Sequence, residues 1–540
     1  MDDVNDLVLG WALTSNMMPS FWVPGAKPGQ QNPGHLIMAS AKSMAYHTVI
    51  VAQSGSGKSF FLGRLLEELA LKTRGRVLIL DPNADFRRMS DVVPEPWWDT
   101  AAYDPTSGNG RLPHEASRAV FEPRWKKMKP QVLSGPYSKP TNSEQLRVSW
   151  NAFPIAVLAE ELDAIPRSQL YHCHEFVKSV AIMEGARRRI EKKEKNKTEQ
   201  NPYPFDKAQK LLQRARHEGA RTTIEEEFGP APKMPEIGGA LWKTIWEFWV
   251  KARHSQARER AISAVEFISP EIEKFYFGRA KEYVAEEIVS SDLADESQQL
   301  NQKIQIIDLP SFKNPRTQHI VLSSVVEAAW NHARQEWAVA FEKDASSDDR
   351  VPLFIVVEEA HNIVPQDELS VSAEALRNQF RTIAAEGRKY GVFLILCTQR
   401  PDKIDKTIVS ECENRAVMKM GSVSVLGRTK ELLGLEHISD DQLRKCLTFQ
   451  IGKFLITGPW TGEEDFLFGY SAMRRTVEGG RNLRREHWAV PEPTGSSEDQ
   501  TSTAPAMEGK SKNAEVKSAK TANMKKKRKH NPKRTVELYN

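Results

Sequence analysis

Short apolar runs alternate with amphipathic helical segments in two widely separated parts of the chain. The first part begins with an apolar, β-branched run at residues 48–51, which is followed by a loop of small residues and by apolar positions at helical spacing over residues 60–69. A second apolar run occupies residues 76–80. A strand, a helix and another strand in this order predict the start of an α/β domain.

The alternation resumes near residue 303. Apolar runs predict strands at residues 304–309, 353–357, 392–397, 415–420, 449–457 and 465–470, and helical periodicity predicts helices at residues 317–343 and 368–389. The last two strands can pair in antiparallel fashion at one edge of the sheet. Together, residues 47–86 and 303–475 predict one α/β domain with a mainly parallel central sheet.

Three segments fall outside this domain. Residues 1–46 contain aromatic residues and prolines without clear periodicity, so we expect an irregular N-terminal lead-in. Residues 87–302 consist of long, charged, helix-favouring segments such as 181–195 and 241–273, which predict a large, all-helical insertion. Residues 476–540 form a C-terminal extension whose later part is rich in Ser, Thr, Pro, Lys and Glu, and we expect it to be a disordered basic tail.

The positive charge is concentrated in that tail. Residues 491–540 carry 11 Lys and Arg against 6 Asp and Glu, an excess equal to the net charge of +5 of the whole chain. The rest of the chain is therefore neutral overall, and any attraction to nucleic acid must come from local patches or from the tail. The basic runs at residues 187–193 and 525–529 could contact phosphates, although a solvated helix face or tail is the commoner explanation.

Features of membrane and secreted proteins are missing from the sequence. No apolar run approaches the roughly 20 residues that a bilayer-spanning helix needs. The acidic start at residues 1–3 lacks the basic region of a signal peptide. The four cysteines lie far apart without paired metal-ligand spacing, which is typical of reduced thiols. We expect a cytoplasmic protein without a membrane segment.

The loop between the first strand and the first helix has the composition of a phosphate-binding loop. Gly55 and Gly57 lack a Cβ, so the backbone can curl until successive N–H groups point at a phosphate chain, above the positive end of the helix. Lys58 would then reach the β- and γ-phosphates of ATP, and the Ser59 hydroxyl would contact Mg²⁺. The predicted nucleotide-binding residues are Gln53, Ser54, Gly55, Ser56, Gly57, Lys58, Ser59 and Phe60. The alternative is a Gly/Ser turn that only joins a buried strand to a helix.

Two acids, Glu358 and Glu359, directly follow the apolar run at residues 353–357. This pattern predicts a buried central strand whose end meets the metal and the attacking water. Glu358 would lie near Mg²⁺, and Glu359 would orient and polarise the nucleophilic water. The alternative is a strand that runs into an acidic helix N-terminus, where negative charge is favourable.

Polar residues around the next strand complete the candidate site. Gln399 follows the strand at residues 392–397 and could hydrogen-bond the γ-phosphate or the water. Ahead of that strand, Arg381 and Arg388 bring positive charge to the end of a helix, and either could reach the ATP of a neighbouring subunit. The simpler alternative is that these cations only favour the negative end of the helix dipole.

These motifs, in this order, resemble the HerA/FtsK superfamily of ring-forming DNA translocases, and within it the HerA-like branch. The matching segments are residues 47–59, 80–86, 307–309, 358–361, 386–391 and 398–401. The resemblance implies a RecA-like P-loop NTPase fold, a hexameric ring with ATP sites between subunits, and DNA in the central pore. It also implies phosphate and Mg²⁺ contacts by Lys58 and Ser59, a catalytic Glu359, a sensor Gln399 and a trans-acting Arg388.

Members of this superfamily often work with a nuclease or another effector, in DNA-end processing or in antiviral defence. The resemblance therefore implies an ATP- and Mg²⁺-dependent DNA translocase or helicase. It would act as a homo-hexamer with an effector protein such as a nuclease or an NAD-consuming enzyme. Two alternatives stay open. One is a conjugation or DNA-packaging motor of the same superfamily, and the other is an ATP-gated ring scaffold that assembles and regulates an effector without translocation.

Overall fold

The computed structural model describes most of the chain up to residue 479. The described ranges are residues 6–18, 20, 35–93, 118–135, 143–149, 167–194, 205–229, 256–285, 289–290, 302–312, 315–341, 348–367 and 370–479. The chain divides into two units, residues 1–481 and 482–540. All described residues belong to the first unit, and the basic run at residues 525–529 and the expected disordered tail lie outside them.

A 12-stranded sheet runs through the first unit, in the order β2-β1-β14-β13-β12-β3-β11-β10-β4-β9-β5-β6. Its strands are β1 Leu7–Ala12, β2 Leu36–Ala39, β3 His47–Val51, β4 Arg76–Asp81, β5 Gln131–Ser134, β6 Ser143–Gln145, β9 Ile304–Asp308, β10 Leu353–Val357, β11 Val392–Thr398, β12 Cys412–Val417, β13 Lys453–Thr457 and β14 Phe466–Ser471. All neighbours from β12 to β6 are parallel. The pairs β12–β13, β13–β14, β14–β1 and β1–β2 are antiparallel. The expected mainly parallel sheet is confirmed, including the antiparallel pairing of the last two strands.

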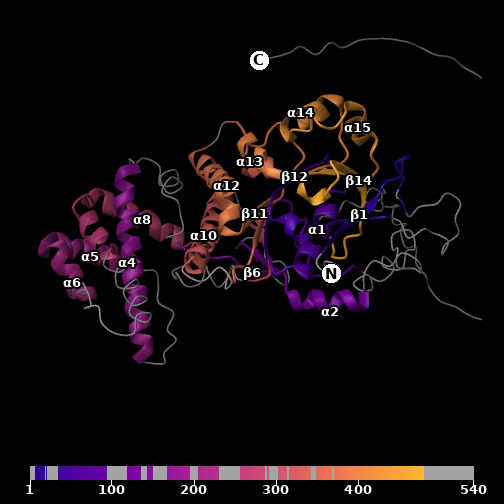
Figure 1. The fold of residues 1–540 in the computed structure, drawn as a ribbon. Coiled ribbons are helices and arrows are strands. Elements are labelled where there is room, and N and C mark those ends of the chain that lie inside the picture. Colours follow the sequence, from indigo (N-terminus) through magenta and orange to yellow (C-terminus); the bar gives the residue numbers. More distant parts are fainter. Residues whose placement is uncertain are drawn as a thin grey trace, which may run out of the picture. The chain divides into compact units, whose positions relative to one another are not determined.

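Helices cover both faces of this sheet (Figure 1). The helices of this part are α1 Lys58–Lys72, α2 Arg118–Met128, α10 Pro315–Phe341, α11 Ala360–Ile363, α12 Val371–Tyr390, α13 Lys406–Ser410, α14 Val423–Leu433 and α15 Asp440–Arg444, with short 3₁₀ turns η1 Ala41–Met44, η5 Leu309–Ser311, η7 Lys445–Thr448 and η8 Pro459–Thr461. The long helix α12 begins after Ser370, whose side chain accepts a hydrogen bond from the Ala373 N–H, and it ends at Gly391 with a φ of 75°. Both caps follow the usual chemistry of helix ends.

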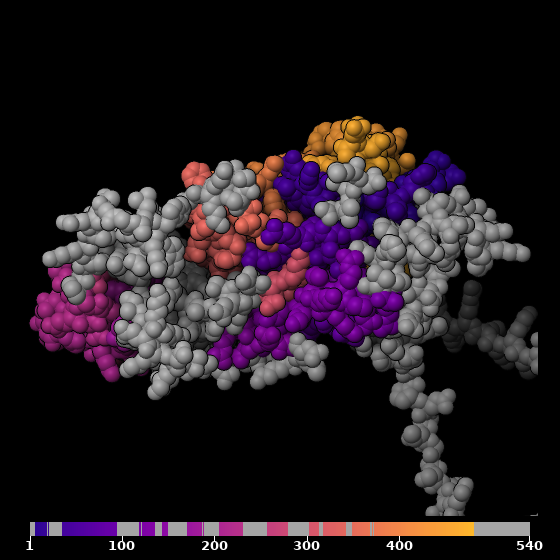
Figure 2. Space-filling model, turned by 60° about the horizontal axis from the view of Figure 1, so that its bottom comes forward, coloured from indigo at the N-terminus to yellow at the C-terminus, as the bar shows by residue number. Residues whose placement is uncertain are grey.

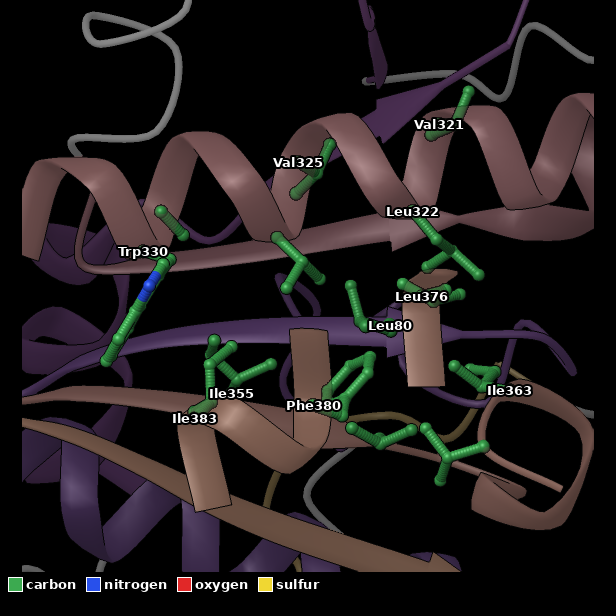
Figure 3. Packing of buried hydrophobic residues seen from close by; sticks show 14 of the residues in the cluster. Leu80, Val321, Leu322, Val325, Trp330, Ile355, Ile363, Leu376, Phe380 and Ile383 are labelled. Carbon is green, nitrogen blue, oxygen red and sulfur yellow. The ribbon is translucent and has the colours of Figure 1, made fainter. Parts of the chain in front are cut away.

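The central strands are buried on both sides because their side chains alternate between two hydrophobic cores. Ile355 and Val357 of β10 belong to one core, with α10 and α12, while Phe354 and Val356 belong to the other, with α1. Figure 3 shows the first core, where Phe380 of α12 lies near Leu80 of β4 and Ile355 of β10. Apolar residues on both faces explain why these strands read as continuous apolar runs in the sequence.

The segment expected to be an all-helical insertion also contributes strands. Its helices α4 Arg167–Glu194, α5 Phe205–Glu218, α6 Ala220–Phe228 and α8 Pro270–Ala285 pack against one another. However, β5 and β6 add to the central sheet, and β7 Val148–Ser149 pairs with β8 Val289–Ser290. The all-helical expectation is therefore wrong, because strands of two to four residues are too short to show periodicity. Of the helix expected at residues 241–273, residues 241–255 lie outside the described ranges, and the rest is interrupted before Pro270.

The N-terminal lead-in is also more regular than expected. Residues of β1 are buried and pair with β14, with Gly10 opposite Ser471 and Trp11 opposite Tyr470. In Figure 2, N-terminal segments in indigo lie next to yellow segments from the last part of the described chain. The sequence did not indicate this strand because its partner lies near the other end of the domain and Gly10 interrupts the apolar run.

Within the described ranges, no helix combines the length and the apolar composition required to cross a bilayer.

The pairing of β1 with β14 requires a residue without a Cβ at position 10. A Cβ at this position would lie 2.0 Å from the backbone oxygen of Tyr470, so the two strands would have to separate. We expect Gly10→Ala to lower the free energy of unfolding by about 1–3 kcal/mol in denaturant titrations. Gly427→Ala is the matched control, because no atom lies within 4 Å of its added Cβ in α14, and it should be neutral or stabilising by about 0.5–1 kcal/mol. Equal stability of the Gly10 variant and the wild type would contradict the pairing.

Candidate nucleotide-binding site

The glycine-rich loop lies at the C-terminal edge of the parallel strands, where β3 ends and α1 begins. Gly55 and Gly57 both have positive φ angles, of 72° and 90°. A Cβ on Gly57 would also lie 3.1 Å from the backbone nitrogen of Gly452. Gly57 is the N-cap of α1, and no side chain caps this helix. Its first N–H groups are therefore available to an anion such as a phosphate.

Lys58 is buried and joins two segments that are 300 residues apart in the sequence. Its Nζ donates hydrogen bonds to Glu358 Oε2 at 2.8 Å and to Glu359 Oε1 at 2.6 Å. Burial acts to lower the pKa of Lys58, but the two carboxylates outweigh it, so the pKa lies above its ordinary value. The lysine is therefore a fixed positive charge, shared between two acids.

The two glutamates follow β10 directly and are buried. Glu358 Oε2 also accepts a hydrogen bond from the Glu359 N–H at 2.5 Å, whereas Glu358 Oε1 has no hydrogen-bond partner. Burial raises the pKa of Glu358, with Lys58 acting in the opposite direction. Glu359 has a φ of 48°, a left-handed conformation that non-glycine residues seldom adopt. Such strained backbone is common at functional sites.

Gln399 and His361 both contact Glu359. Gln399, which follows β11, donates a short hydrogen bond from Nε2 to Glu359 Oε1. His361 places Nδ1 3.3 Å from Glu359 Oε2 and 3.1 Å from Thr398 Oγ1. Burial lowers the pKa of His361, although Glu359 opposes this effect. Gln399 is thus where the sequence analysis placed it, and His361 is an additional neighbour of the candidate base.

A second acidic loop, residues 81–86 after β4, also belongs to the site, although its residues were not among the predicted site residues. Asp85 Oδ2 accepts a hydrogen bond from the Ser59 hydroxyl at 2.8 Å. Asp81 shapes the loop, because its carboxylate accepts hydrogen bonds from the backbone N–H groups of Asn83, Asp85 and Phe86. Burial raises the pKa of Asp81 to about 7. Acids at the end of β4 were visible in the sequence, but the turn that points Asp85 at Ser59 was not.

The residues present fit a magnesium ion. Hydroxyl and carboxylate oxygens are preferred ligands of Mg²⁺, which in nucleotide sites uses one or two carboxylates together with phosphates. Ser59 Oγ and the unpartnered Glu358 Oε1 are such donors. Lys58 faces two buried carboxylates, and Asp85 adds a third acid, which lies near the cation of Arg474. The site therefore has excess negative charge that a divalent cation would neutralise.

The two candidate arginines differ in their surroundings. Arg381 Nη2 contacts the buried carboxylate of Asp405 at 2.6 Å. Arg388 is half exposed, pairs with exposed Glu413 at 2.9 Å and lies 4.3 Å from the centre of the Tyr46 ring. Arg388 precedes β11, whereas the glycine-rich loop lies beyond the other ends of the strands. Seven residues of strand span about 20 Å, so Arg388 cannot reach the nucleotide site of its own chain.

Two sequence models of protein families match this chain. The model described as "Helicase HerA, central domain" matches residues 37–329, and the model of the "ATPase family associated with various cellular activities (AAA)" matches residues 294–420. The first range contains Lys58 and Ser59, and the second contains both glutamates and Gln399.

Individual relatives match shorter stretches. A probable helicase of Methanocaldococcus jannaschii is 33% identical over 116 residues, which are 22% of this chain and 21% of the relative. The DNA double-strand break repair helicase HerA of Pyrococcus furiosus is 28% identical over 176 residues, 29% of this chain and 30% of the relative. The matches thus span between a fifth and a third of the length of these relatives.

Solved structures include similar chains at low identity. The bacterial conjugative coupling protein TrwBdeltaN70 gives a TM-score of 0.40 at 12% identity, over 82% of this chain and 89% of that chain. VirB4 of Thermoanaerobacter pseudethanolicus gives 0.36 at 13% identity, over 91% of this chain and all of that chain.

The family assignment follows from the first of the two sequence models. It spans more than half of the chain and includes the glycine-rich loop whose geometry suits a phosphate. This chain belongs to the family of the helicase HerA central domain, a family of P-loop ATPases.

Proposed function

We propose that this protein is an ATP-hydrolysing DNA translocase or helicase that works as a homo-hexameric ring. The observation that carries the proposal is the convergence of Lys58, Glu358 and Glu359 at one edge of the sheet. An effector partner such as a nuclease or an NAD-consuming enzyme, in DNA-end processing or antiviral defence, completes the proposal. This last part rests on the family resemblance alone.

In the proposed mechanism, Lys58 leaves the two glutamates when ATP binds and donates to the β- and γ-phosphates. The loop N–H groups and the N-terminus of α1 hold the phosphate chain. Ser59 and Glu358 would hold Mg²⁺, which supplies charge neutralisation on the phosphates. Once Lys58 has moved, Glu359 is free to accept a proton from the attacking water, and Gln399, already bonded to Glu359, orients that water.

The position of Arg388 supports the proposal that the protein forms a ring. This side chain is half exposed at the edge of the sheet opposite the nucleotide site. An arginine there can stabilise the transferred phosphoryl group only in the next subunit. A head-to-tail contact of this kind joins two different surfaces and closes into a ring when the rotation permits.

DNA as the substrate is supported by the names of the relatives, which include helicases of double-strand break repair. Within the described residues, Arg187 of the basic run at residues 187–193 is paired with Glu184 and Glu227. This run is therefore weak support for DNA contact.

Replacing Lys58 tests nucleotide binding. We expect Lys58→Ala to weaken ATP binding about 100-fold or more, because charge-assisted hydrogen bonds to phosphate are lost. Binding of a fluorescent ATP analogue measures this change. Lys72→Ala is the matched control on the same helix, about 21 Å away along its axis, and should bind ATP like the wild type. Unchanged affinity in Lys58→Ala would remove the phosphate-loop assignment.

Replacing Glu359 separates a motor from a scaffold. We expect Glu359→Gln to keep ATP binding and ring assembly but to reduce hydrolysis about 10²- to 10⁴-fold, because a general base is lost. Wild-type hydrolysis should be stimulated by DNA and coupled to strand displacement. Wild-type turnover in Glu359→Gln would exclude it as the base. DNA-independent turnover, together with full support of the effector by Glu359→Gln, would favour the scaffold alternative.

We expect Arg388→Ala and Arg381→Ala to have opposite effects on turnover and stability. We expect Arg388→Ala to lower kcat about 10³-fold or more, with ATP affinity kept and the free energy of unfolding changed by less than about 0.5 kcal/mol. Arg381→Ala should instead lower the free energy of unfolding by about 2 kcal/mol or more, because the buried Asp405 carboxylate loses its closest ion-pair partner. Normal turnover in Arg388→Ala, measured at a concentration at which the wild type forms rings, would exclude a finger at this position.

A further inference from the structure

A short segment that follows β14, residues 472–479, lies against the back of the nucleotide site; we call it the C-terminal strap. The Ala472 N–H donates to the Leu9 oxygen, and the Val477 N–H donates to the Asp91 oxygen. At the end of the strap, the Gly479 N–H donates to the backbone oxygen of Asp85 at 2.9 Å. The strap therefore contacts the same loop that presents Asp85 to Ser59.

A buried acid of α1 fixes the middle of the strap. Glu67 accepts hydrogen bonds from the Arg475 N–H at 2.9 Å, the Thr476 N–H at 2.7 Å and the Thr476 hydroxyl at 2.8 Å. Burial raises the pKa of Glu67, and Arg64 and Arg474 oppose that effect. Three bonds to one buried carboxylate hold the strap to the helix that begins at Lys58.

Arg474 reaches from the strap into the site and is fully buried. Its Nη1 donates to the backbone oxygen of Ser59 at 3.3 Å, and its Nη2 donates to the backbone oxygen of Asp85 at 3.3 Å. Its other bonds return to the strap, to Thr476 Oγ1 and the Val477 oxygen. One planar guanidinium thus contacts the backbone of both Ser59 and Asp85, whose side chains are hydrogen-bonded to each other.

The surroundings of Arg474 are shaped to hold it. Its Cζ lies 4.8 Å from the centre of the Phe86 ring. In α1, a Cβ on Gly63 would lie 2.4 Å from Arg474 Cδ and 2.9 Å from its Cζ. A glycine within α1 is unfavourable for helix formation, and the room it leaves for this side chain explains its presence.

We propose that Arg474 is a positioning residue for the metal–nucleotide site: it fixes the spacing of Ser59 and Asp85 and so links the C-terminal strap to nucleotide binding. The inference deepens the proposed function and rests on it, since it requires that Ser59 contacts a metal bound with ATP. Because coupling between two sites is reciprocal, bound Mg²⁺–ATP should also stabilise the strap.

The test compares ATP affinity with and without magnesium in the full chain. We expect Arg474→Ala and Arg474→Lys to lower the affinity for a fluorescent ATP analogue in Mg²⁺ by about 10- to 100-fold, the usual cost of losing an outer partner of a metal ligand. Affinity in EDTA should change by less than about twofold. Arg475→Ala is the matched control, because this neighbouring arginine lies over the Phe121 ring, and it should bind like the wild type under both conditions.

Gly63→Ala gives an independent route if Arg474→Ala does not fold. The added methyl group displaces the guanidinium although alanine favours a helix, so the same magnesium-dependent loss is expected. In the wild type, Mg²⁺–ATP should slow amide hydrogen exchange of residues 472–479.

Three outcomes would each overturn the inference. They are wild-type Mg²⁺–ATP affinity in the folded Arg474 and Gly63 variants, equal losses of affinity in EDTA and Mg²⁺, and no exchange protection of the strap. Lys58→Ala separates the two failures: if it binds ATP normally, the proposed function fails, and if only the Arg474 and Gly63 variants behave like the wild type, the strap inference alone fails.

Discussion

The buried group of Lys58, Glu358 and Glu359 is the interaction on which the account depends. Removing one ammonium and two carboxylates from water carries a large desolvation cost, and mutual attraction offsets it only when the geometry is tightly held. Here the sheet provides that geometry, because β3, β11 and β10 are adjacent and parallel and therefore end at the same edge. Their order brings together two segments that are 300 residues apart in the sequence.

Lys58 alone cannot balance the charges of both glutamates. Glu358 Oε1 remains without a hydrogen-bond partner, and Asp85 lies beside Ser59. In the proposed mechanism, phosphates and a divalent cation replace Lys58 beside the two glutamates when the nucleotide binds. The two arginines have different surroundings. Arg381 is committed to Asp405, whereas Arg388 faces outward at the opposite edge.

Much of this architecture could be predicted from the sequence, because the central strands are long, apolar and followed by chemically distinctive residues. Local sequence was enough to predict the glycine-rich loop, the two glutamates that follow β10, and the position of Gln399 after β11. By contrast, β5 and β6 are too short to show a period, and β1 depends on a partner, β14, at the far end of the domain. The positive φ of Ala84, in the turn before Asp85, and the burial of Arg474 behind Gly63 arise only when distant segments pack together. Sequence patterns report local periodicity, and these features are not local.

The most direct measurement is an experimental structure of the full chain with Mg²⁺ and a non-hydrolysable ATP analogue. We expect Lys58 Nζ to have left Glu358 and Glu359 for the β- and γ-phosphates, with Ser59 and Glu358 beside the metal and Glu359 facing the γ-phosphate. A nucleotide bound elsewhere, with Lys58 still held between the two glutamates, would contradict it.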